Sequence, residues 1–433
     1  MQEYIEPLAR QTVLLLLVQL ALILFVARAL GALAERVGYP VVVGELLTGI
    51  VLGPSVLGLL APDLFRTLFP PNATQFHLLE VVAFIGLLLL LVLTGLETDL
   101  ELIRRESRTA AAISLAGIAV PFAMGFALGE WMPREFLATP DQPIVFSLFL
   151  ATALSISAIP VVARVLMDLD ALGRGVGQLT IVAAMVDDTI GWFLLSLVAG
   201  LARRGGFDAV GTVTTAGFLF AFLIVAFTVG QWLVTALMNS AATGSDRTTL
   251  STIVILALGT GAITVGIGLE AVLGAYVVGI LVERSGALDG RTFQAFENIT
   301  IGVFAPVFFA TAGLRVDLSA LAEPSTAAIA AITLAVAIAG KFVGAAIGAL
   351  GTGRSRWVAF TVGAGLNARG AIELVVATVG LQLGVLTIEL YSIIVLVAVV
   401  TSLMAPPLLR WSLARHPEEH APERADEVAT HRH

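Results

Sequence analysis

Thirteen apolar runs of roughly 20 residues make up most of this 433-residue chain. A helical run of that length crosses the hydrocarbon core of a bilayer, and in lipid only helices and closed barrels satisfy their own backbone groups. Hydrophobic residues form 58% of the chain and charged residues 13%, whereas soluble domains carry about 25% charged residues. The chain is therefore predicted to be an all-α polytopic membrane protein.

The ninth predicted span is the shortest, so its boundary with the eighth is the least defined. The spans cover residues 11–30, 40–60, 78–97, 109–130, 144–167, 175–200, 212–238, 249–267, 270–283, 293–313, 325–350, 357–382 and 388–410. With the N-terminus outside, sixteen of the 24 Lys and Arg residues lie on the inner side and six on the outer side. This distribution obeys the positive-inside rule. We expect an outside N-terminus, a cytoplasmic C-terminus and, because the start MQEYIE is acidic, a first span that is not cleaved.

Two short motifs recur seven spans apart. The third span ends in LTGLETDL and the tenth in TAGLRVDL, while the second reads GELLTGIVLG and the ninth GAYVVGILVE. An odd offset reverses orientation, so the pattern predicts two inverted six-helix repeats joined by a linker helix, the seventh span, as in many secondary transporters. The alternative is a chance likeness between glycine-rich helices.

The fifth and twelfth spans are predicted to be discontinuous and to cross near the midplane, where inverted-repeat transporters place their sites. The fifth carries Pro160, which lacks a backbone donor, and the hydroxyl residues Thr152, Ser155 and Ser157. In the twelfth, three glycines flank a polar stretch that contains Asn367 and Arg369. The alternative is that each is a kinked but continuous helix, with its hydroxyls bonded to the preceding turn.

Ionisable residues at bilayer depth indicate function because each costs about 2.5 to 3.5 kcal/mol on insertion scales. Asp187 and Asp188 lie side by side in the sixth span, and Lys341, the only lysine of the chain, lies in the eleventh. Carboxylates are hard oxygen ligands for alkali cations, and a proton competes with the cation for the same group. We expect the two aspartates, with hydroxyls of Thr152, Ser155 and Ser157, to bind the cation. The alternative is a fixed Asp–Lys pair that only orients helices.

Other function classes fit the chain less well. Aspartic hydrolases need two carboxylates that face each other, whereas adjacent helical residues point about 100° apart. The chain has no G-x-S-x-G or H-E-x-x-H motif, and no filter-like loop of the kind that channels use. No cofactor, enzyme activity or nucleic-acid partner is expected. An ion channel and a proton-coupled solute transporter stay open as alternatives.

The histidines and two further acids were also considered as site residues. His77 is placed in a loop and the other four histidines in the tail, so no histidine base is expected in the membrane. Glu45 and Glu80 are interpreted as helix-packing residues or residues at a mouth of the transport path. The chain has no cysteine, which excludes disulfides and thiolate chemistry.

Taken together, ATALSISAIPVVARVL, MVDDTIGW, GKFVGA, GLNARGAIELVV and GELLTGIVLGPSVLG resemble the sodium/proton antiporters of the cation/proton antiporter-2 family, over residues 10–412. The resemblance implies a thirteen-helix homodimer in a bacterial cell membrane, with a mobile core domain that moves as an elevator. It implies that Asp188 carries the cation and the proton, and that Asp187 pairs with Lys341. The paired aspartates imply electrogenic exchange of sodium.

This resemblance divides the chain into parts, taken in sequence order. Residues 1–60 and 249–283 form the dimerisation domain, 78–200 and 293–410 the two halves of the core domain, 212–238 the linker helix and 411–433 a disordered tail. The stretch NARGAIEL is more similar to potassium-handling and plant relatives, which keeps K⁺ open beside Na⁺. Arg369 and Glu373 lie four residues apart, where an internal ion pair is favoured over a direct ligand role.

Overall fold

The described part of the chain is helical, with no named strand among those residues. The computed structural model describes residues 7–98, 108–157, 159–169, 171, 175–204 and 209–415. Ten helices in this part are long and apolar enough to cross a membrane. The other three predicted spans correspond to the short helix α14 and to the interrupted pairs α8–α9 and α18–α19. The chain is thus a multi-pass membrane protein, and the predicted tail from residue 416 on lies outside the described residues.

The first half of the chain forms eleven of the named elements. They are α1 (Arg10–Arg36), α2 (Val41–Leu52), α3 (Leu57–Leu60), α4 (Pro62–Leu68), α5 (Ala73–Leu96), α7 (Arg108–Trp131), η1 (Arg134–Phe136), α8 (Pro143–Ser155), α9 (Ile159–Asp168), α10 (Gly175–Arg203) and α11 (Ala209–Val225). His77 lies in the first turns of α5 and not in a loop as predicted, because Asn72 caps this helix through bonds to the amides of Thr74 and Gln75.

The second half continues with two π-helical segments inside longer helices. The elements are η2 (Ala226–Gly230), α12 (Gln231–Ala242), α13 (Asp246–Gly266), α14 (Ala271–Ser285), α15 (Gly290–Ile299), η3 (Thr300–Phe304), α16 (Ala305–Gly313), η4 (Leu318–Ala322), α17 (Pro324–Gly351), α18 (Arg356–Leu366), α19 (Ala371–Gln382) and α20 (Ile388–Arg415). The η2 and η3 segments join α11 to α12 and α15 to α16 without leaving helical geometry.

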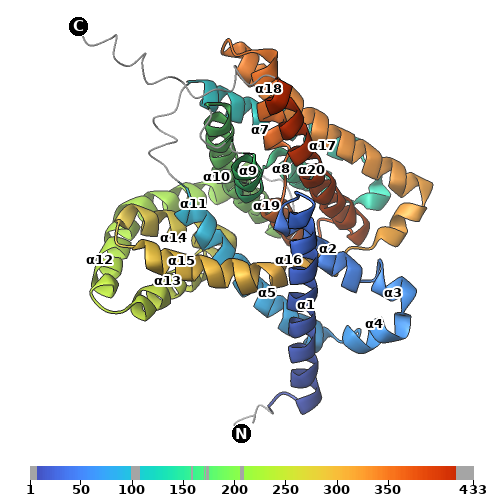
Figure 1. The fold of residues 1–433 in the computed structure, drawn as a ribbon, viewed down its shortest axis with the longest axis vertical. Coiled ribbons are helices and arrows are strands. Elements are labelled where there is room, and N and C mark those ends of the chain that lie inside the picture. Colours follow the sequence, from blue (N-terminus) through green and yellow to red (C-terminus); the bar gives the residue numbers. More distant parts are fainter. Residues whose placement is uncertain are drawn as a thin grey trace.

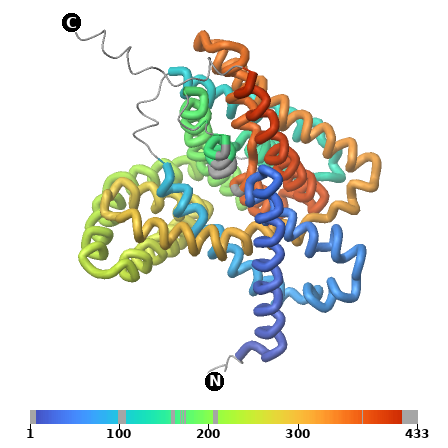
Figure 2. Tube along the Cα trace, in the orientation of Figure 1, coloured from blue at the N-terminus to red at the C-terminus, as the bar shows by residue number. Residues whose placement is uncertain are grey.

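Helices from both halves of the chain form one bundle, named here the core bundle: α7 to α10 and α17 to α20 (Figure 1). Figure 2 shows these two stretches in the same part of the molecule, although α11 to α16 separate them in sequence. The closest pairing is α7 with α17. Three glycines of α17, spaced four apart, permit it, since a Cβ at Gly344 would lie 2.5 Å from the Ala116 carbonyl oxygen.

Another set of helices forms a second unit, named here the scaffold: α1, α2, α5, α13, α14 and α15–α16. In it α2 packs against α1 and α16, and α14 packs against α13 and α5. We therefore group α5 and α16 with the scaffold, whereas the division expected from sequence put residues 78–97 and 293–313 with the core helices. In Figure 1, α5 and α16 run between the α12–α15 region and α1.

Two glycine pairs hold the scaffold helices at close distance. A Cβ at Gly49 would lie 2.5 Å from the Gly313 Cα, and one at Gly95 would lie 2.9 Å from the Gly279 Cα. Close approach of this kind replaces the hydrophobic driving force that lipid removes between membrane helices. The contacts of α2 with α16 and of α5 with α14 therefore depend on glycine.

The Gly279→Ala variant is expected to unfold at a lower temperature, because its Cβ would meet the Val92 carbonyl oxygen at 2.2 Å. Overpacking of this kind costs about 1 to 3 kcal/mol. Thermal unfolding in detergent measures it, with Gly259→Ala as the control, since a Cβ at Gly259 meets nothing within 4 Å. Equal melting temperatures for both variants would contradict the close-packing assignment.

Candidate functional site

The site is built where two interrupted helices meet helix α10. Helix α8 ends at Ser155 and the chain is extended at Ile156 before α9 begins at Ile159. Helix α18 ends at Leu366, and α19 begins at Ala371. The Ser157 hydroxyl lies 2.7 Å from the Leu366 carbonyl oxygen, so the two breaks contact each other directly.

Asp187 is fully buried and contacts α17, α7 and the break after α8. Its Oδ2 lies 2.7 Å from Lys341 Nζ and 2.9 Å from the Ser157 hydroxyl. Its Oδ1 accepts a hydrogen bond of 3.0 Å from Ser114 on α7. An ammonium and two hydroxyls thus replace the hydration that the carboxylate loses on burial, as a buried ion pair requires.

Lys341 reaches this position because α17 lies so close to α7. Its ammonium donates to the Gly117 carbonyl oxygen at 3.0 Å as well as to Asp187. The lysine is fully buried, as is Asp188, the next residue after Asp187 on α10. Adjacent helical residues point about 100° apart, so Asp188 presents its carboxylate to different surroundings from those of Asp187.

The hydroxyls predicted as cation ligands have separate positions. Ser157 contacts Asp187 directly. The Thr152 hydroxyl donates to the Leu148 carbonyl oxygen at 2.8 Å, and the Ser155 hydroxyl donates to that of Thr152 at 3.0 Å. The hydroxyl protons therefore bond carbonyl oxygens of their own helix, and the lone pairs of the hydroxyl oxygens can still coordinate a cation. Their role as ligands stays a prediction.

Arg369 donates hydrogen bonds to the carbonyl groups at the C-terminal end of α8. Its guanidinium donates to the carbonyl oxygens of Ala153 at 3.0 Å and Leu154 at 2.7 Å, and it pairs with Glu373 at 3.1 Å. The last carbonyls of a helix lack partners within it and carry a partial negative charge. A cation placed there stabilises the interruption. Asn367 lies fully buried in the break between α18 and α19, and neither polar atom of its side chain has a hydrogen-bond partner among the described residues.

Glu80, predicted as a helix-packing or mouth residue, lies away from these breaks. It pairs with Arg315 at the end of α16 and with His77 at 2.7 Å. Glu80 and Arg315 border a small cavity with Thr311 and Gln382. Glu45 is buried in α2 of the scaffold. Sequence reasoning missed Ser114, whose only signal was a single hydroxyl in an apolar span.

Comparison with known proteins identifies the family. The family model described as sodium/hydrogen exchanger, transmembrane, matches residues 21–415. The chain belongs to this family. It is 31% identical to the Na(+)/H(+) antiporter NhaS4 of Synechocystis, over 92% of this chain and 97% of that protein. It is 29% identical to the K(+)/H(+) antiporter 1 of Saccharomyces cerevisiae, of which it spans 46% while 91% of this chain is covered.

The fold also matches a solved antiporter structure. The sodium proton antiporter MjNhaP1 from Methanocaldococcus jannaschii superimposes with a TM-score of 0.64 at 16% identity, over 94% of this chain and 97% of that one. At this identity the match shows a common fold. With the family match, it identifies the chain as a transmembrane cation/proton antiporter.

The Arg369→Gln variant is expected to lose stability, because the Glu373 carboxylate loses its ion pair and the last carbonyl oxygens of α8 lose their hydrogen-bond donors. Breaking a buried ion pair from one side costs about 3 to 5 kcal/mol. The control is Arg369→Gln combined with Glu373→Gln, which removes both charges and should recover part of the loss. Thermal unfolding in detergent compares the two. A double variant less stable than Arg369→Gln would contradict the pairing.

Proposed function

We propose that this protein exchanges a monovalent cation for protons, with Asp188 as the group that carries either ion. The supporting observation is a count of charges. Among the described residues, five Asp, Glu, Lys or Arg side chains are at most 1% exposed: Asp187, Asp188, Lys341, Arg369 and Glu373. With all five ionised, three acids face two bases and one negative charge remains. A buried net charge is costly, so a proton or a monovalent cation is needed to neutralise it.

Asp188 is the best candidate for this exchange. It is fully buried directly beside the Asp187–Lys341 pair, and its place in MVDDTIGW matches the ion-carrying acid of the antiporters that this motif resembles. A carboxylate oxygen binds either a proton or a hard cation, and occupancy by one excludes the other. This competition is sufficient for antiport, provided that the site opens to one side of the membrane at a time.

The Asp187–Lys341 pair adds a second proton to the cycle. When a cation binds between the aspartates, it weakens the attraction of Asp187 for the ammonium. A fully desolvated ammonium then releases its proton more readily. Two protons against one cation move net charge, so we propose electrogenic exchange that responds to the membrane potential.

Four glycines of the first two helices support the proposed inverted repeats. Gly31, Gly38, Gly44 and Gly49 recur 230 residues later as Gly261, Gly268, Gly274 and Gly279. Gly38 and Gly268 both have positive φ, 80° and 85°, in the turns after α1 and α13. We propose that α8–α9, α14 and α18–α19 complete thirteen spans, that the two interrupted helices cross, and that α11–α12 is the linker.

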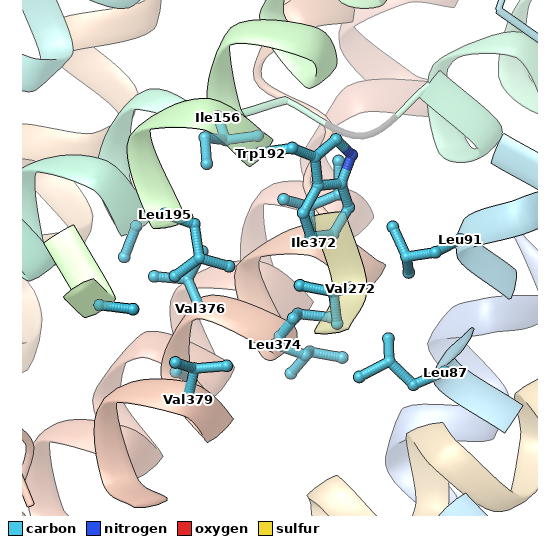
Figure 3. Close-up of a cluster of buried hydrophobic side chains, with 14 of the residues drawn as sticks. Leu87, Leu91, Ile156, Trp192, Leu195, Val272, Ile372, Leu374, Val376 and Val379 are labelled. Atoms are coloured by element: carbon cyan, nitrogen blue, oxygen red, sulfur yellow. The ribbon is translucent and has the colours of Figure 1, made fainter. Parts of the chain in front are cut away.

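An apolar interface supports an elevator motion of the core bundle. Figure 3 shows Trp192, Leu195 and Ile156 of the core facing Leu87, Leu91 and Val272 of the scaffold, with the α19 side chains Ile372, Leu374, Val376 and Val379 among them. Such contacts are non-directional, so one surface slides over the other without breaking many hydrogen bonds. A homodimer through the scaffold, in a bacterial cell membrane, completes this proposal.

Sodium is the proposed cation, with potassium as the second candidate. A site of one or two carboxylates and a few hydroxyls is compact, which favours Na⁺ and Li⁺. The name of the Synechocystis relative specifies Na⁺ and that of the yeast relative K⁺. The proposed physiological direction is cation extrusion driven by proton entry.

The Asp188→Asn variant is expected to abolish exchange, because an amide neither carries a proton nor offers a negative charge. A pH-sensitive dye in proteoliposomes measures H⁺ movement after addition of Na⁺, Li⁺ or K⁺. Asp188→Glu is the matched control and should keep partial activity with a changed apparent affinity. Cation-dependent H⁺ movement at the wild-type rate in Asp188→Asn would refute the assignment.

Lys341→Gln should reduce the charge moved per cycle and lower thermal stability, since Asp187 loses its contact with the ammonium. Currents on solid-supported membranes after addition of NaCl or KCl measure the charge moved, and the larger current identifies the preferred cation. Clear dye-detected exchange without any current in the wild type would establish electroneutral coupling. Unchanged stability and current in Lys341→Gln would exclude the lysine from the cycle.

A further inference from the structure

Tyr276 links the aspartate helix to the scaffold. This residue of α14 is fully buried, and its hydroxyl lies 2.8 Å from the Thr189 hydroxyl of α10. Thr189 directly follows Asp188. The Tyr276 ring also contacts the Trp192 ring, one turn further along α10, at a centroid distance of 6.0 Å. The contact of α10 with α14 thus combines a hydrogen bond with an aromatic pair beside the proposed carrier residue.

The same hydroxyl has a second neighbour on the scaffold. Thr98, just after the end of α5, places its hydroxyl 3.2 Å from that of Tyr276. Helices α5 and α14 are held together by the close contact of Gly95 with Gly279. Because Thr98 and Tyr276 both belong to the scaffold, their separation does not depend on the position of the core bundle.

Each threonine has a carbonyl acceptor for its own proton. Thr189 Oγ1 donates to the Met185 carbonyl oxygen at 2.9 Å, and Thr98 Oγ1 donates to that of Thr94 at 2.8 Å. With their protons on these carbonyls, both threonines act as acceptors toward Tyr276, whose phenol has a single proton. The shorter distance places this proton on the Thr189 contact in this state.

We propose that Tyr276 is a positioning residue of the transport cycle, which holds Thr189 in one state and transfers its hydrogen bond to Thr98 when α10 moves away. A buried hydroxyl left without an acceptor would oppose the movement. Thr98 supplies that acceptor. The hydrogen bond between Tyr276 and Thr189, called the latch below, therefore breaks at little cost in free energy. This inference rests on the proposed elevator motion, and it adds a residue of the scaffold that controls the rate of that motion.

The decisive experiment introduces Thr98→Val into the wild type and into Tyr276→Phe. In the wild type this change should lower the maximal exchange rate about 5-fold or more. When the bond to Thr189 breaks, the Tyr276 hydroxyl then has no acceptor on Thr98. The apparent cation affinity should stay the same, since the site is untouched. In Tyr276→Phe there is no hydroxyl to strand, so Thr98→Val should have no effect. The matched control is Thr48→Val, at a buried threonine of α2 whose hydroxyl donates to the Gly44 carbonyl oxygen of its own helix.

A second measurement does not require transport. Deuterium uptake by the α10 segment around Thr189, without added cation, should rise in Tyr276→Phe and in Thr189→Val but not in Thr98→Val. If the wild type shows no exchange, the proposed function fails while uptake still tests the latch. An equal rate loss from Thr98→Val in both backgrounds, or unchanged uptake in Tyr276→Phe, would overturn the inference.

Discussion

The ion pair between Lys341 and Asp187 is the contact on which the core bundle depends. It joins α17 to α10, and the further bonds of these two side chains reach α7 and the break after α8. In lipid an unpaired ammonium or carboxylate at this depth would be expensive, so the four elements are bound to one arrangement. The glycines of α17 are part of the same constraint, because a wider α7–α17 spacing would move the ammonium away from the Gly117 carbonyl oxygen.

The same physical rule explains Arg369. An interrupted helix in a membrane exposes carbonyl groups that water cannot reach, and these groups need a donor within the protein. The guanidinium provides several donors in one plane. It donates hydrogen bonds to carbonyl oxygens of α8 and to the Glu373 carboxylate. The arginine therefore stabilises the interruption that follows α8.

The strongly charged part of the site could be predicted from sequence, because ionisable residues inside apolar spans stand out. The helical class and the likeness to an antiporter family followed from the same spans and motifs. Ser114 could not be predicted, since a serine in a membrane helix commonly bonds its own preceding turn and only the α7–α10 packing gives it another partner. The packing of α5 against α14 and α16 could not be predicted for a similar reason, because the apolar surface of a helix does not specify which neighbour it contacts.

The apolar contact surface between core bundle and scaffold has a consequence for energy conservation. Side chains such as Leu91, Val272 and Ile372 leave few polar groups that could order a chain of water molecules across this surface. A proton needs such a chain to pass through a protein. In the proposed elevator motion, the surface along which the bundle would slide is therefore also an electrical insulator. It would prevent the proton gradient from discharging while the proposed carrier residue is between the two sides of the membrane.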